Sequence, residues 1–191
     1  MNAHTSAFRT VLYALALAAA TAAAAADEGR RELKAHAHGH GKLDIAIEGN
    51  RVTLGLDTPA ADILGFESLA TSPEQKAAVA NAKARLAEPL KLFVMPAAAG
   101  CTLARSEVEI DVEEHSGDTA KPGDHSHEHA DVEAEYELTC ASPAALTSIA
   151  FDFFQAFKGA QSLEVSVITD KGQTSRSVTR ENPRLDLAGL M

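Results

Sequence analysis

The chain has 191 residues, with 17 Lys and Arg against 27 Asp and Glu, and a formal net charge of −10 at pH 7. This acidic balance argues against binding to nucleic acid or to an anionic membrane surface. It is typical of a protein that attracts cations.

Residues 1–26 have the pattern of a signal peptide. Arg9 gives a short positive region, residues 11–20 form an apolar run too short to span a bilayer, and residues 24–26 are small alanines. We expect cleavage before Asp27, a periplasmic location, and one domain over residues 27–191. An N-terminal membrane anchor or a disordered Ala-rich tail is the alternative, and no later segment predicts stable membrane insertion.

The next segment predicts a hairpin followed by a helix. Residues 42–49 and 51–56 alternate apolar and polar side chains on either side of a turn. Ser72 and Pro73 then have the residue types of a helix start, with Gln75 at the third position. We expect this helix to end near Pro89.

The second half predicts two more hairpins and a second helix. Residues 106–113 and 131–138 alternate, and they flank a flexible His-rich and acidic loop at 114–130. The apolar spacing from Leu146 to Phe157 predicts a helix from Ser142 to Gly159. Residues 163–169 and 173–179 form the third hairpin. The expected fold is α+β, a mostly antiparallel sheet of three hairpins with the two helices packed on one face.

The apolar pattern of the second hairpin predicts the face of the sheet on which each of the two cysteines lies. Apolar side chains change parity between Leu103 and Val108, which predicts a β-bulge near Arg105. The bulge would bring Cys101 to the apolar face with Cys140. In an exported protein we expect these two to form a disulfide. A role in a metal site is the alternative, although neither cysteine has CxxC or CxH spacing.

Two groups of histidines share parity with polar or acidic residues of the predicted strands. Alternate residues point to the same face of a strand, so both groups are expected to point away from the core. Residues 107–137 also hold twelve Asp and Glu against one Lys, a repulsion that a divalent cation would relieve. The candidate metal ligands are His36, His38, His40, His115, His125, His127 and His129, with Asp124, Glu128 and Asp131.

Imidazole ligands suit zinc, copper, nickel and iron, so the ligands alone leave the metal open. No HExxH or HxHxDH pattern, Ser-His-Asp set or phosphate loop is present in the sequence. We therefore expect a binding protein rather than an enzyme. A binder or sink for nickel or copper, or an interaction protein with incidental histidines, are the alternatives.

The run AHAHGHGKLDIAIEG, followed by TPAADILGFE, resembles the ZrgA-like proteins, which are secreted zinc-regulated proteins of Gram-negative bacteria. The tail resembles them too, in ASPAALTSIAFDFFQAF and SLEVSVITDKGQTSRSVTRENPRLDL. His36 and His38 fall on the HxHG motif of that family, which Gly39 completes, and GDHSHEHAD is the counterpart of its variable loop. The resemblance implies periplasmic Zn²⁺ binding in support of zinc import, beside a zinc ABC transporter with its own solute-binding protein.

Overall fold

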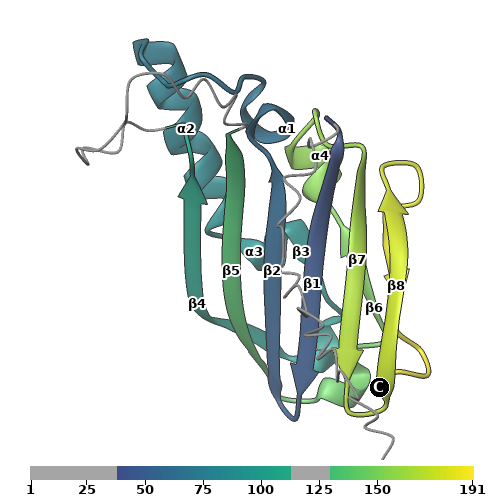
Figure 1. Ribbon diagram of the computed structural model, residues 1–191. Coiled ribbons are helices and arrows are strands. Elements are labelled where there is room, and N and C mark those ends of the chain that lie inside the picture. The colour runs from purple at the N-terminus through teal and green to yellow at the C-terminus, as the bar shows by residue number, and fades with distance from the viewer. Residues whose placement is uncertain (1–37, 113–129) are drawn as a thin grey trace, which may run out of the picture. The chain divides into compact units, whose positions relative to one another are not determined.

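The computed structural model describes residues 38–112 and 130–191, within one compact unit that spans Leu33–Met191. Its main feature is a six-stranded sheet with the order β4-β5-β2-β1-β7-β8 (Figure 1). All neighbouring strands pair antiparallel except β1 and β7, which run parallel. The predicted α+β class with a mostly antiparallel sheet is confirmed. The six strands are β1 (His40–Glu48), β2 (Arg51–Pro59), β4 (Cys101–Ile110), β5 (Asp131–Cys140), β7 (Ser162–Thr169) and β8 (Gly172–Thr179).

The prediction of three hairpins was too simple. The pairs β1–β2, β4–β5 and β7–β8 form as expected, but pairing of β2 with β5 and of β1 with β7 merges them into one sheet. A second sheet of short strands, in the order β3-β6-β9, was not predicted. Its members are β3 (Phe93–Val94), β6 (Ser148–Phe151) and β9 (Arg184–Asp186).

The first predicted helix is confirmed, and the second is wrong. Helix α2 (Pro73–Leu86) begins with a complete capping box, in which Ser72 accepts from the Gln75 amide and Gln75 accepts from the Ser72 amide. In place of the second helix, the chain forms strand β6 and then the short helix α4 (Phe153–Ala156). The apolar side chains from Leu146 to Phe157 are mostly buried in the observed strand and short helix too, so their spacing alone does not distinguish a helix from a strand.

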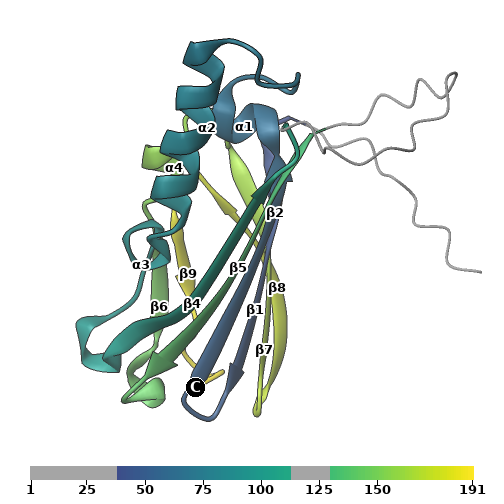
Figure 2. The ribbon, with the colours of Figure 1, turned by 90° about the vertical axis from the view of Figure 1, so that its left-hand side faces the viewer.

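The helices and the small sheet cover one face of the six-stranded sheet, and no helix or strand of residues 38–112 and 130–191 covers the other, which we call the open face (Figure 2). Helices α1 (Ala60–Leu64), α2, α3 (Pro89–Leu92) and α4 all lie on the covered side. The core fills the space between, built from the inward residues of the large sheet and from a cluster of phenylalanines. Within residues 38–112 and 130–191, no helix is long and apolar enough to cross a membrane.

The predicted bulge and disulfide are both present. The β4–β5 register shifts between Leu103 and Arg105, which is where the apolar side chains change parity. Cys101 lies directly opposite Cys140 and is bonded to it. The two cysteines therefore fasten the edge strand β4 to β5 and are not available as metal ligands.

Candidate functional site

The turn before β1 is held in place from two sides. The Gly39 amide donates a hydrogen bond of 2.7 Å to Oδ1 of Asp62, and the Gly39 carbonyl accepts from the amides of Gln161 and Ser162. Gly39 is buried and has a φ of 85°, which favours glycine. The second half of the HxHG motif is thus attached both to α1 and to the start of β7.

Asp62 is a buried carboxylate beside this turn. Its residue is 4% exposed, and Oδ2 has no hydrogen-bond partner among the described residues. Burial raises the pKa of the Asp62 carboxyl and Glu67 adds to that rise, whereas the Gly39 amide and the charges of His38 and His40 oppose it. The carboxylate therefore lies within electrostatic reach of both histidines.

His38 lies against a second carboxylate. Its Nδ1 is 3.4 Å from Oε1 of Glu67, with side chains that are 63% and 26% exposed. Two ligand atoms on a tetrahedral zinc ion are about 3.3 Å apart when each bond is about 2.0–2.1 Å long. The pair therefore already has the separation that a shared ion requires. His40 points elsewhere, with Nδ1 at 2.7 Å from Oγ of Ser162.

Comparison with known protein families identifies the chain. Residues 35–187 match the family described as ZrgA family zinc uptake protein. The chain belongs to the ZrgA family. No curated protein matches it. The family match includes the HxHG motif, Asp62 and Glu67, and it gives this ZrgA chain a role in zinc uptake.

Zinc as cargo fits the groups gathered at this corner of the ZrgA chain. Imidazole nitrogen and carboxylate oxygen are both zinc ligands, and the unpartnered Oδ2 of Asp62 is a buried acceptor that a cation would satisfy. Among residues 38–112 and 130–191, no three His, Cys, Asp or Glu side chains lie close enough together to hold one metal ion. A single ion bound here would have to draw His38 and Glu67 toward Asp62.

The backbone around Asp62 is held by a tightly packed segment after α4. A Cβ at Gly159 would come within 2.5 Å of the Asp62 carbonyl oxygen, so only glycine fits there. Arg180 organises this segment, because its guanidinium donates to the carbonyls of Phe154, Phe157, Lys158 and Ala160 and also lies over the Phe154 ring. The position of Asp62 thus depends on contacts from the C-terminal part of the ZrgA chain.

The open face of the sheet has a different character. Glu133 on β5 lies directly opposite Glu109 on β4 and opposite Asp57 on β2. Burial raises the pKa of Glu133, and four nearby carboxylates, led by Asp57, raise it further. The predicted ligand Asp131 begins β5 and is one of these four. This face therefore concentrates negative charge.

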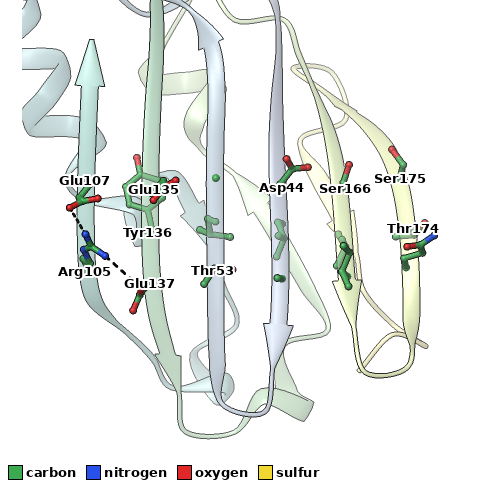
Figure 3. Close-up of a pocket in the computed structure, with 17 residues that line it drawn as sticks. Asp44, Thr53, Arg105, Glu107, Glu135, Tyr136, Glu137, Ser166, Thr174 and Ser175 are labelled. Carbon is green, nitrogen blue, oxygen red and sulfur yellow. Dashed lines mark hydrogen bonds and ion pairs between the residues drawn. The ribbon is translucent and has the colours of Figure 1, made fainter. Parts of the chain in front are cut away.

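A hollow of about 760 Å³ lies in the middle of the same face (Figure 3). Its lining residues include no histidine or cysteine, so it offers carboxylates without nitrogen or sulfur ligands. Arg105 is paired there with Glu107 and lies 4.0 Å from Glu137. One row across the hollow takes one residue from each strand: Glu107, Glu135, Gly55, Asp44, Ser166 and Ser175.

Three of the predicted ligands lie in the described part of the chain, and one of them, His38, lies 3.4 Å from a carboxylate oxygen of Glu67. His40 contacts Ser162, and Asp131 belongs to the acidic face. The other predicted ligands lie outside the described residues: His36, His115, Asp124, His125, His127, Glu128 and His129.

Sequence reasoning missed Asp62 and Glu67 as site residues. Both lie in the run TPAADILGFE, which carried part of the family resemblance. An acidic residue in the first turn of a helix usually has a simpler explanation, since it complements the helix dipole. The sequence feature that could have indicated Asp62 is its position between the apolar residues Ala60, Ala61, Ile63 and Leu64, which predicts a buried carboxylate.

Proposed function

We propose that this protein captures or buffers Zn²⁺ in the periplasm and supports zinc import as an accessory to a zinc ABC transporter. The observation that carries the proposal is the His38–Glu67 pair beside the buried carboxylate of Asp62, in a chain of a zinc uptake family. The negative charge of the open sheet face supports it, because such a field raises the local concentration of cations.

In this proposal the histidines of the HxHG motif and those of the loop have different roles. His36 and His38 bind zinc at the HxHG turn, and the loop residues His115, His125, His127 and His129 add capture capacity with Asp124, Glu128 and Asp131. The acceptor of the zinc is the solute-binding protein of the transporter. The role is one of binding and delivery without catalysis.

The test is a zinc titration against a calibrated chelator, using the processed protein, a His36→Ala/His38→Ala variant and a variant lacking residues 115–129. We expect the double substitution to remove the tightest site and the deletion to remove weaker sites, with the fold retained by circular dichroism. Binding should weaken below about pH 6, as imidazoles protonate. Two results would contradict the proposal. One is binding of Ni²⁺ or Cu²⁺ that is tighter than zinc binding by more than the general affinity order of these ions explains. The other is normal growth, under zinc limitation, of a strain that lacks the protein.

A further inference from the structure

We infer that the Asp62 carboxylate is itself a ligand of the ion bound at the HxHG turn, and that His38 and Glu67 complete a three-ligand site with it. This inference rests on the proposed function and names the residues of that site. It goes beyond the histidine clusters that the sequence predicts, because two of its three ligands come from the segment around α1.

The two oxygens of Asp62 have different surroundings. Oδ1 accepts the Gly39 amide at 2.7 Å, whereas Oδ2 is buried and has no hydrogen-bond partner among the described residues. Buried polar atoms nearly always have partners, because leaving one unsatisfied is unfavourable. Carboxylates that bind metal are typically held through hydrogen bonds that orient them. The Gly39 bond performs that orienting role and leaves Oδ2 for the ion.

The same hydrogen bond links the carboxylate to the histidine motif. Gly39 directly follows His38, so the atom that orients Asp62 belongs to the turn that presents the imidazole. His38 in turn lies 3.4 Å from Glu67. One backbone amide and one close side-chain pair thereby connect all three proposed ligands.

The three ligands differ in their freedom to move. Asp62 is fixed by Gly39 on one side and by the close approach of Gly159 on the other. His38 is 63% exposed, and Glu67 lies in the connection between α1 and α2. Both side chains therefore lie nearer the surface than Asp62 does. A site with one fixed ligand and two ligands nearer the surface suits an ion that is bound and later released.

The alternative is that Asp62 only fastens the turn. Asparagine separates the two roles, because its side-chain oxygen can still accept the Gly39 amide while the negative charge and the second oxygen are lost. Asp62→Ala removes both roles. Asp152→Asn is the matched control, since Asp152 is an exposed aspartate that caps no helix through its side chain.

The experiment measures Zn²⁺ affinity by chelator competition and the visible spectrum of the Co²⁺-loaded protein, with the processed full chain. We expect Asp62→Asn to weaken the tightest site at least tenfold and to change the Co²⁺ spectrum. The Gly39 amide should keep its protection from hydrogen exchange, and Asp152→Asn should match the wild type.

Two outcomes would overturn the inference. Wild-type affinity and spectrum in Asp62→Asn would remove Asp62 from the ligand set. Weakened binding that comes together with loss of Gly39 protection would make Asp62 a fastening for the turn. Failure of the proposed function would give other results. In that case the wild type itself would bind no zinc, or His38→Ala would leave the tightest site unchanged.

Discussion

Asp62 and Glu133 are both carboxylates whose pKa is raised, and in both cases burial is the largest cause. Their neighbours differ. Asp62 has a backbone amide and two histidines that favour its charged form and one carboxylate, Glu67, that disfavours it, whereas Glu133 has four carboxylates that disfavour it. Two acids with the same direction of pKa shift thus have different surroundings, which fit the roles proposed for them: a directed bond to a cation at Asp62 and a diffuse attraction of cations at Glu133.

The packing around the two regions differs in the same way. At the Asp62 corner, Gly159 leaves no room for a methyl group, and Arg180 makes four hydrogen bonds to backbone carbonyls. On the open face, a Cβ at Gly55 would meet nothing within 4 Å. We conclude that the corner depends on accurate geometry and that the open face depends on charge. The following substitutions test that difference.

Replacing Arg180 with Gln should have the largest effect. It removes the four hydrogen bonds that Arg180 donates to carbonyls of residues 154–160, and we expect a loss of about 2–3 kcal/mol in the free energy of unfolding, measured by urea denaturation. Zinc affinity should fall too, because Asp62 would lose its support. Arg176→Gln is the matched control on an exposed arginine and should change stability by less than about 0.5 kcal/mol. Equal effects of the two substitutions would remove the special role of Arg180.

Replacing Gly159 with Ala should destabilise the fold by about 1–3 kcal/mol, because the new methyl group would press on the backbone of Asp62. The zinc site should weaken more than the fold does, since the displaced residue is the proposed ligand. Urea denaturation and chelator competition on the same sample measure both effects. A variant with normal stability and normal zinc affinity would show that this corner tolerates displacement.

Replacing Glu133 with Gln should stabilise the protein at pH 7, by less than about 1 kcal/mol because the side chain is exposed. The pKa of Glu133 is higher in the folded state than in the unfolded chain, so its charged form opposes folding above the folded pKa. Below the unfolded pKa, about 4.3, both states are protonated and the advantage of Gln should vanish. Urea midpoints between pH 7 and pH 3.5 would reveal this trend. A less stable variant at pH 7 would mean that Glu133 gains more from its surroundings than it loses.

Replacing Gly55 with Ala should have the smallest effect. The site has open space, and glycine is a poor residue in the middle of a strand, so we expect a gain of about 0.5 kcal/mol. The Gly-to-Ala substitution would then stabilise the protein at position 55 and destabilise it at position 159. A loss larger than about 1 kcal/mol at Gly55 would contradict the comparison between corner and open face.

Much of the fold could be predicted because its signals are local. The alternation in the three hairpins, the Ser72–Gln75 capping box and the parity change before Val108 all depend on residues close in sequence. The helix predicted after Ser142 failed because side chains at a helical apolar spacing can also be buried by a strand followed by a short helix, and packing with distant segments decides between the two. The parallel pairing of β1 with β7 has no local signal at all.

The site was predictable only in part, for the same reason. The histidines of the HxHG motif are visible as a pattern, so His38 could be predicted as a candidate ligand from the sequence. The proposed role of Asp62 depends on its burial and on backbone contacts with Gly159, which lies far along the chain. Sequence spacing could not reveal such a contact.

The parallel pairing of β1 with β7 has a consequence for the order of folding. The carbonyl of Gly39 accepts hydrogen bonds from the amides of Gln161 and Ser162, and these two residues are synthesised long after the turn. Contacts between such distant segments form slowly, because the long intervening chain must first be ordered. A nascent or truncated chain that ends before β7 would therefore contain His38, Asp62 and Glu67 but not the corner they share. The metal site should be among the last parts of the molecule to mature.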